Sequence, residues 1–160
     1  MEVKIQQYSI GFMFNDDMTE VLLLLKGHGP KCVIGRWNGI GGHFNLIPGT
    51  NEYETPVACQ VREFHEETGV LTDESDWAKF TDLVGNDFKV HCFWGRNTKF
   101  VEAAKTTTEE EVAICFTHPK TIVQPLAPNL NWWIPFLCDT TTKNHLCVVL
   151  ATYLKDDDLG

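Results

Sequence analysis

The chain has 160 residues, 43% of them hydrophobic and 22% charged, a composition that indicates a folded globular domain and excludes a disordered or fibrous chain. Its formal charge of −9 argues against a surface that holds long nucleic acids, because phosphate binding requires clustered Lys and Arg. No aliphatic run approaches the length of a membrane span, and residues 1–4 lack a secretory hydrophobic region. We therefore expect one cytoplasmic domain over residues 1–160, with an acidic tail at about 155–160.

The six cysteines are widely spread, and none of them forms a Cys-x-x-Cys pair. Their neighbours are mostly apolar, which is typical of small hydrophobic side chains in a core. We therefore expect reduced, buried thiols rather than disulfides or zinc ligands.

Hydrophobic patterns predict strands over 3–14 and 20–26, joined by a turn at Asn15-Asp16-Asp17. Four glycines within residues 35–42 indicate a tight bend or a close approach of the backbone. The later predicted elements are strands at 88–95, 111–116 and 146–154 and an aromatic-rich helix at 129–138. Strands on both sides of a helix predict an α/β protein with a mixed sheet between helices.

The clearest predicted helix lies between Thr55 and Gly69. Thr55 can cap the free backbone amides, Pro56 suits the first helical position, and Gly69 ends the helix. The apolar residues Val57, Val61 and Phe64 fall on one stripe at helical spacing, so this side of the helix is expected to pack inward.

Three carboxylates, Glu63, Glu66 and Glu67, lie together on another side of this helix. Without a basic partner at i+4 they repel one another. A hard divalent cation such as Mg²⁺ offsets this repulsion, since it binds carboxylate oxygens together with substrate phosphates and water. The alternative interpretation is a solvated acidic face.

The segment Arg62-Glu63-Phe64-His65-Glu66-Glu67-Thr68-Gly69-Val70 resembles the core motif of the Nudix hydrolase family, and Glu54 lies eight residues before Arg62, as in that motif. The resemblance extends over most of the chain. The segments Arg-Trp-Asn-Gly at 36–39 and Trp-x-x-Pro near the end are most similar to the MutT-like branch, which hydrolyses oxidised purine nucleoside triphosphates. Eleven residues separate Gly42 from Glu54 where the family motif has five, which indicates a six-residue insertion at about 44–49.

The resemblance implies a Nudix-type α/β/α sandwich and a Mg²⁺ or Mn²⁺ site at which water attacks phosphorus. It implies catalytic roles for Arg62, Glu63, Glu66 and Glu67, with Glu63 as the general base. Arg62 is expected to orient a glutamate such as Glu54, the alternative being a surface ion pair. The implied metal ligands are Glu63, Glu66, Glu67, Glu111 and Gly42, and for Glu111 the alternative is a solvated edge.

The resemblance also implies a base-binding role for Asn38, with Asn129 and Trp133 closing the pocket. Of the neighbouring tryptophans Trp132 and Trp133, we expect one to fill the core. The predicted activity is hydrolysis of a nucleoside triphosphate, such as dGTP or 8-oxo-dGTP, to the monophosphate and pyrophosphate. The alternatives are hydrolysis of ADP-ribose, a dinucleoside polyphosphate or capped RNA, and a nucleotide sensor without catalysis. We expect a monomer or homodimer with a small nucleotide as its partner and no long nucleic acid or membrane.

Overall fold

A mixed six-stranded sheet forms the centre of the computed structural model, which describes residues 4–118 and 125–139. Its strands follow the order β3-β2-β1-β5-β4, and β6 also pairs with β2. β1 runs parallel to β5, whereas its pairing with β2 is antiparallel. The strands are β1 (Gln6–Phe14), β2 (Glu20–Leu25), β3 (Trp37–Asn38), β4 (Ala78–Val84), β5 (Phe88–Arg96) and β6 (Val112–Phe116).

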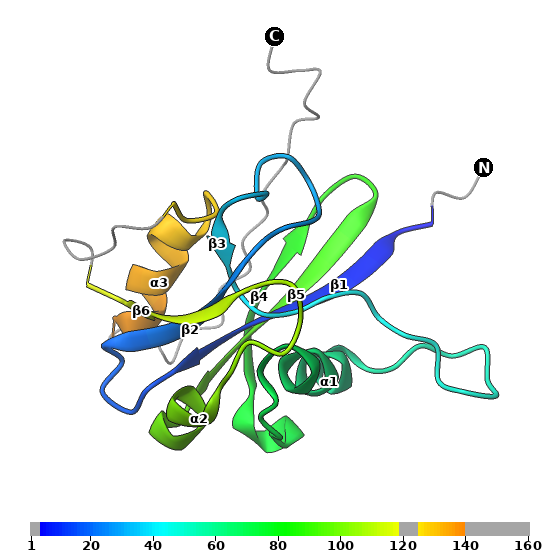
Figure 1. The fold of residues 1–160 in the computed structure, drawn as a ribbon. Helices are drawn as coiled ribbons and strands as arrows, with labels where there is room; N and C mark the ends of the chain where they lie inside the picture. The colour runs from blue at the N-terminus through cyan, green and yellow to red at the C-terminus, as the bar shows by residue number, and fades with distance from the viewer. Residues whose placement is uncertain (1–3, 119–124, 140–160) are drawn as a thin grey trace, which may run out of the picture.

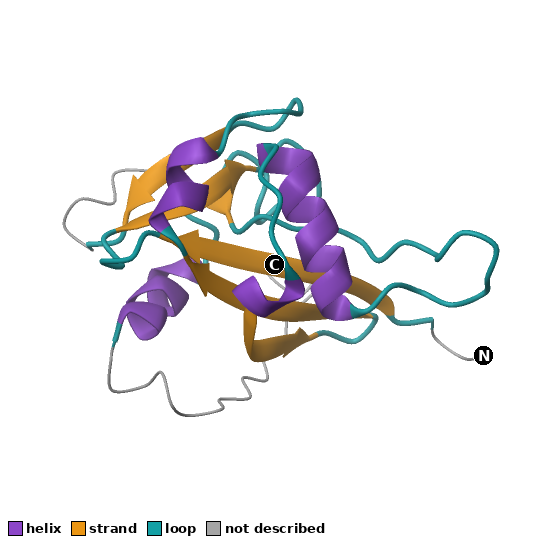
Figure 2. Cartoon of the chain, turned by 90° about the horizontal axis from the view of Figure 1, so that it is seen from below, coloured by secondary structure: helices purple, strands orange, loops and turns teal. Residues whose placement is uncertain are grey.

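Helices cover both faces of this sheet (Figures 1 and 2). The helices are α1 (Pro56–Thr68), α2 (Thr98–Ala103), α3 (Leu130–Cys138) and the 3₁₀ helix η1 (Glu74–Asp76). Phe12 and Phe14 of β1 are buried in one core cluster with Trp133 of α3. Met13, between them, is buried in a second cluster with Phe64 of α1. Because successive strand residues point to opposite faces, this alternation places α1 and α3 on opposite sides of β1. The predicted α/β/α sandwich with a mixed sheet is confirmed.

Several predicted elements are present with small shifts in their ends. β1 begins at Gln6, β2 ends at Leu25, β6 begins at Val112, and α3 spans most of the predicted aromatic helix. The predicted strand at 146–154 and the acidic tail at 155–160 lie outside the described residues.

β4, α2, η1 and β3 were not predicted. In β4 the pairing register with β5 shifts between Lys79 and Thr81, and such a bulge breaks the period of two by which a strand is recognised. α2 has only six residues and β3 only two, which is too short for a periodic pattern.

All five cysteines within the described residues are free, as expected. Cys59 and Cys92 are buried as expected, Cys115 and Cys138 are only half-buried, and Cys32 is exposed, so the expectation of burial is wrong at Cys32. Cys32 lies in the loop after β2, where the backbone turns at 31–35 and the neighbouring side chains are also exposed or half-buried. Of the helices that the structure describes, none combines the length and apolar character needed to cross a bilayer.

Candidate active site

Helix α1 carries the predicted site, and its ends are those expected from the sequence. The Thr55 side chain accepts a hydrogen bond from the Ala58 N–H at 3.2 Å, and Gly69 has the left-handed φ of 73° that ends the helix. Phe64 and Gln60 are fully buried on the sheet side. Gln60 Nε2 also donates to the Ile40 carbonyl at 3.0 Å, which fixes the helix against the segment that follows β3.

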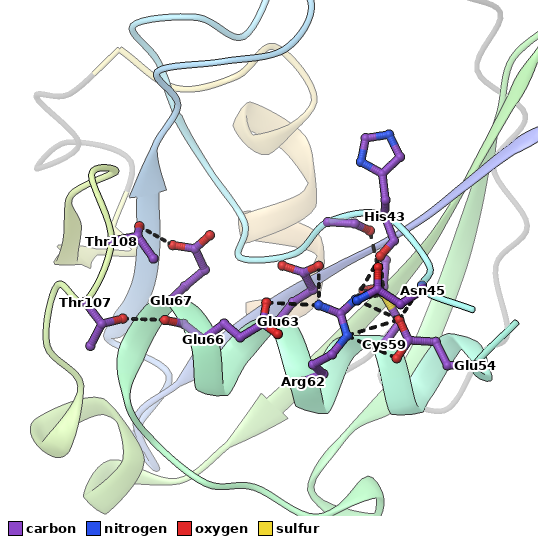
Figure 3. Close-up of polar contacts among 12 residues, drawn as sticks. His43, Asn45, Glu54, Cys59, Arg62, Glu63, Glu66, Glu67, Thr107 and Thr108 are labelled. Carbon is purple, nitrogen blue, oxygen red and sulfur yellow. Dashed lines mark hydrogen bonds and ion pairs between the residues drawn. The ribbon is translucent and has the colours of Figure 1, made fainter. Parts of the chain in front are cut away.

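The carboxylates of Glu63, Glu66 and Glu67 extend from one side of α1 (Figure 3). They differ in exposure: the side chain of Glu63 is 13% exposed, whereas that of Glu66 is 52% exposed. Burial raises the pKa of Glu63, and the neighbouring carboxylates of Glu66 and Glu67 add to this, although Arg62 opposes it. A half-buried carboxylate with a raised pKa beside other acids is a typical environment for a general base.

Arg62 connects these carboxylates to the chain that precedes the helix. Its Nη2 lies 2.7 Å from Glu54 Oε1, and its Nε donates to Glu54 Oε2 at 3.1 Å. Its Nη1 lies 2.8 Å from Glu63 Oε1 and 3.0 Å from Glu66 Oε2. The expected pairing of Arg62 with a glutamate such as Glu54 is therefore confirmed, and one guanidinium holds three carboxylates.

The charge of Arg62 also determines the ionisation of Glu54. Burial alone would raise the pKa of Glu54, but the hydrogen bonds from Arg62 and from the Asn45 N–H lower it below its usual value. The pKa of Arg62 is raised in turn, chiefly by its hydrogen bond to Glu54. Glu54 and Arg62 thus form a charged pair at neutral pH, consistent with a bidentate arginine–carboxylate interaction.

Gly42 lies directly over Glu63. A Cβ atom at position 42 would lie 2.5 Å from the Glu63 carboxylate, so only glycine leaves room for that side chain here. The Gly42 carbonyl accepts the Ser9 N–H of β1 at 2.9 Å, and the next carbonyl, of His43, accepts Arg62 Nη2 at 2.8 Å. The backbone at 42–43 therefore links β1 to the charged cluster.

The predicted insertion forms a small hairpin that projects from the body of the protein, seen in cyan at the right of Figure 1. Leu46 bridges to Tyr53, and the Ile47 N–H donates to the Glu52 carbonyl at 2.8 Å. At its base the Glu54 N–H donates to the Asn45 carbonyl at 3.0 Å, and Glu54 Oε1 accepts the Asn45 N–H at 2.8 Å. The extra residues thus leave Glu54 beside Arg62.

Glu63, Glu66 and Glu67 form a carboxylate row along α1 (Figure 3). The loop between α2 and β6 contacts this row at the end away from Arg62. Thr108 Oγ1 donates to Glu67 Oε2 at 2.6 Å, and Thr107 Oγ1 donates to the Glu66 carbonyl (Figure 3). Glu111 is exposed, and its side chain has no hydrogen bond or ion pair with the described residues. Glu110, not Glu111, is held by neighbours: its carboxylate accepts Lys26 Nζ at 2.9 Å and the Gly27 N–H at 2.7 Å.

The chemistry of the donor set fits a hard divalent cation, since three carboxylates share one helix face. Gly42 leaves the space that Glu63 needs, and Glu66 is exposed enough to turn. Within residues 4–118 and 125–139, however, no three His, Cys, Asp or Glu side chains already converge on one point where they could hold an ion. Glu63 and Glu66 instead point to Arg62, and Glu67 points to Thr108.

The predicted base-binding residues lie apart from α1. Asn38 belongs to strand β3 of the sheet, whereas Asn129 and Trp133 lie at the start and in the middle of α3, on the opposite face of the sheet from α1. Asn38 is half-buried in β3, where its Oδ1 accepts the N–H of Gly39 at 2.9 Å. Asn129 precedes α3, and its side chain makes no capping hydrogen bond. Trp133 is 0% exposed and packs edge-on against Phe12 and Phe80, whereas Trp132 is 43% exposed. Trp133 is thus the tryptophan that fills the core.

The likeness to solved structures identifies the fold. No family model matches this sequence, and no curated protein matches it either. The NUDIX domain of Shewanella oneidensis NrtR, solved in complex with ADP ribose, matches with a TM-score of 0.63 over 84% of this chain and 86% of that one, at 16% identity. The fold is a Nudix fold.

Other solved proteins share this fold with the chain. A NUDIX hydrolase from Nitrosomonas europaea matches with a TM-score of 0.62 and 11% identity, covering 96% of this chain and 82% of the other. A MutT from the study of Aliivibrio salmonicida and Vibrio cholerae matches with a TM-score of 0.55 and 19% identity, covering 71% of this chain and 82% of that one. The shared Nudix fold agrees with the motif on α1.

Sequence reasoning missed the parts of the site that lie beyond the motif. Thr107, Thr108 and Glu110 were not singled out, although they belong to a run of three threonines and three glutamates at 106–111. Such a run has no periodicity. Only the fold brings it to the end of α1.

Proposed function

We propose that this protein is a pyrophosphohydrolase that uses Mg²⁺, with Mn²⁺ as a substitute, to cleave a nucleoside triphosphate. The observation that carries the proposal is the arrangement of Glu63, Glu66 and Glu67 on one face of α1 (Figure 3). Arg62 joins Glu63 and Glu66 to Glu54, and Thr108 donates to Glu67. This arrangement combines a place for a divalent cation with a half-buried carboxylate, Glu63, that can accept a proton. The Nudix fold of the chain supports the same chemistry.

In this proposal Glu63, Glu66 and Glu67 hold the cation, with the Gly42 carbonyl and Glu111 completing the ligands. A bound divalent cation would neutralise charge on the diphosphate and lower the pKa of a water molecule. We propose Glu111 rather than Glu110 because the Glu110 carboxylate is occupied by Lys26 and by the backbone N–H groups of Gly27 and His28.

The chain's own residues perform the proton transfer. Glu63, as general base, accepts a proton from the water that attacks phosphorus, and the P–O bond that joins the α- and β-phosphoryl groups breaks. Arg62 is a positioning residue in this scheme, since its Nη1 lies 2.8 Å from Glu63 Oε1 and its Nε and Nη2 donate to Glu54. The products are a nucleoside monophosphate and pyrophosphate.

The proposed substrate is a purine deoxynucleoside triphosphate such as dGTP or 8-oxo-dGTP. The Asn38 amide can donate to and accept from a purine, and Asn129 and Trp133 lie in α3 or at its start. The indole N–H of Trp133 is buried and has no acceptor among the residues that the structure describes, and an acceptor on a ligand would satisfy it. Because Trp133 has no exposed surface, stacking on a base requires movement of α3.

ADP-ribose is the second candidate substrate. It is favoured by the NrtR domain, which was solved with ADP ribose and gives a TM-score of 0.63. Hydrolysis of a dinucleoside polyphosphate or of capped RNA would use the same carboxylates, as would a nucleotide sensor that has lost catalysis. With a formal charge of −9, the chain is expected to favour small nucleotides over long nucleic acids.

The test is release of phosphate, in the presence of added inorganic pyrophosphatase, from canonical and oxidised dNTPs, with AMP formation followed for ADP-ribose and diadenosine polyphosphates. Each reaction is run with Mg²⁺ and with EDTA. We expect one purine dNTP to react at least about tenfold faster than the other compounds, and only with the metal. Faster hydrolysis of ADP-ribose than of any dNTP would show that ADP-ribose is the substrate. Tight nucleotide binding in calorimetry, without formation of any product, would show that the protein is a nucleotide sensor and not a hydrolase. We also propose a monomer or homodimer in the cytoplasm.

A further inference from the structure

The loop at 104–111 contacts α1 at two consecutive glutamates of the carboxylate row. Thr107 Oγ1 donates to the main-chain carbonyl of Glu66, and Thr108 Oγ1 donates to the side-chain Oε2 of Glu67 at 2.6 Å. Of the two threonines, therefore, only Thr108 contacts the carboxylate of a proposed metal ligand, because Thr107 contacts the main chain of Glu66. Figure 3 shows these two contacts at the end of the row away from Arg62.

The hydroxyl of Thr108 is held in one orientation. Its oxygen accepts the Glu110 N–H at 3.2 Å. Its single proton has two acceptors within reach, Glu67 Oε2 at 2.6 Å and the Glu110 carbonyl at 3.5 Å, and the shorter contact to the charged carboxylate is the stronger one. A hydrogen bond to a charged acceptor is about twice as strong as one between neutral groups. The contact therefore fixes one oxygen of Glu67 and leaves the other free.

Glu110 anchors this loop to the end of β2. Its side chain is 11% exposed and accepts hydrogen bonds from Lys26 Nζ and from the N–H groups of Gly27 and His28, at 2.9, 2.7 and 3.2 Å. These three hydrogen bonds fix Glu110, and with it the loop that carries Thr108.

We propose that Thr108 is a positioning residue that presents the free oxygen of Glu67 to the divalent cation. Lys26 and Glu110 act behind it by holding the loop. This role rests on the proposed function, because it gives Thr108 importance only if Glu67 is a metal ligand. Groups that orient metal ligands change metal affinity by about 10- to 100-fold when they are removed.

The test measures Mn²⁺ binding directly, by the electron paramagnetic resonance signal of free Mn²⁺ in titrations without nucleotide, and then the Mn²⁺ dependence of hydrolysis. Thr108→Val removes the hydroxyl, Thr108→Ser keeps it, and Thr107→Val is the matched control on the neighbouring residue. Thr108 is exposed, so all three variants should fold. We expect Thr108→Val to raise the Mn²⁺ dissociation constant about tenfold, with Thr108→Ser and Thr107→Val within about threefold of the parent chain.

A second variant tests the anchor behind Thr108. Lys26→Met removes one of the three donors to Glu110, and we expect it to weaken Mn²⁺ binding in the parent chain but not in the Thr108→Val background. Equal Mn²⁺ affinity of Thr108→Val and the parent chain, or equal loss in Thr108→Val and Thr107→Val, would overturn the positioning role while leaving the hydrolase intact. Failure of the parent chain to bind Mn²⁺ would overturn both proposals, whereas Mn²⁺ binding without hydrolysis of any nucleotide would overturn the hydrolase alone.

Discussion

The position of the Glu63 carboxylate depends on single residues outside α1, above all on Gly42. Gly42 and Gly41 both lie where the chain after β3 passes over β1 and α1, but an added side chain would meet different atoms. At Gly42 it would meet the mobile end of the Glu63 side chain, whereas at Gly41 it would overlap the backbone carbonyl of Ser9. A flexible carboxylate can move aside, but a strand backbone cannot.

Gly42→Ala should therefore retain its stability and lose activity. We expect its free energy of unfolding to change by less than about 1 kcal/mol, whereas nucleotide hydrolysis falls at least about tenfold because Glu63 is displaced. Gly41→Ala should lose about 2 kcal/mol or more, as overpacked sites do. Urea unfolding and rate measurements on both variants check this, and full activity of Gly42→Ala would show that the position of Glu63 is not important.

Among single residues, the sequence predicted those of the motif on α1 but not the residues outside the motif that hydrogen-bond to them. The pairing of Arg62 with Glu54 could be predicted because both residues belong to one motif with fixed spacing. Glu110 and Thr108 could not, because their partners lie 84 and 41 residues away in sequence. The predicted loop residue Glu111 differs from its neighbour Glu110 only in the direction of its side chain, which the fold decides.

Among the elements, the hairpin at 45–54 shows how the chain accommodates an insertion close to the site. Its internal bonds join Leu46 to Tyr53 and Ile47 to Glu52, and its base is closed by Asn45 and Glu54. The exposed side chains of Leu46, Ile47 and Tyr53 lie on the hairpin itself. The contacts between the hairpin and Arg62 of α1 therefore come from the base of the hairpin and not from its tip.

Replacing residues 46–53 by Asn-Gly should leave the site intact. Asn45 and Glu54 already stand in the relation that a two-residue turn requires, because the Glu54 N–H donates to the Asn45 carbonyl at 3.0 Å. We expect the shortened chain to hydrolyse nucleotide within about threefold of the parent rate. Glu54→Gln is the contrasting variant, since it weakens the charged pair with Arg62. Loss of hydrolysis in the shortened chain, with its fold retained, would show that the hairpin tip contributes to the site.

The elements that could be predicted from the sequence are those whose ends carry capping or helix-breaking residues. α1 is bounded by Thr55, Pro56 and Gly69, and the structure places its ends as predicted. β4 carries Phe80 on a bulge that interrupts its alternation, so its pattern resembles neither a strand nor a helix. The order of strands, with β1 next to β5, also depends on long-range pairing that no local pattern shows.

For the whole molecule, the sheet brings a second charged cluster to the α1 side of β1, β5 and β4, around the buried His91. Its Nε2 lies 2.8 Å from Gln7 Oε1, and its Nδ1 lies 3.0 Å from Lys79 Nζ and 3.1 Å from Asp82 Oδ1. The Phe44 ring stacks on it at 5.5 Å. Burial, together with the charges of Lys79 and Lys89, lowers the pKa of His91 to about 4, although Asp82 opposes this shift.

A lowered histidine pKa predicts how stability changes with pH. Between the ordinary pKa of 6.5 and the folded value of about 4, only the unfolded chain binds this proton, so the contribution of His91 is full above pH 6.5 and decreases as the pH falls. The free energy of unfolding of the parent chain, relative to His91→Gln, should decrease by about 1 kcal/mol per pH unit from pH 6.5 to 4.5. Urea unfolding at three pH values checks this, with the exposed His28→Gln as control. If the difference in the free energy of unfolding between the parent chain and His91→Gln stayed the same from pH 6.5 to 4.5, the pKa of His91 would not be lowered.

The central claim for the whole molecule is that the carboxylates of α1 perform metal-dependent hydrolysis of a nucleotide. The most direct measurement compares the turnover of the best substrate at saturating Mg²⁺ in the parent chain, in Glu66→Gln and in Glu102→Gln, an exposed glutamate on α2. Each variant is first shown to fold by circular dichroism. We predict that Glu66→Gln lowers turnover at least about 100-fold while Glu102→Gln does not change it. Full turnover by Glu66→Gln would contradict the account.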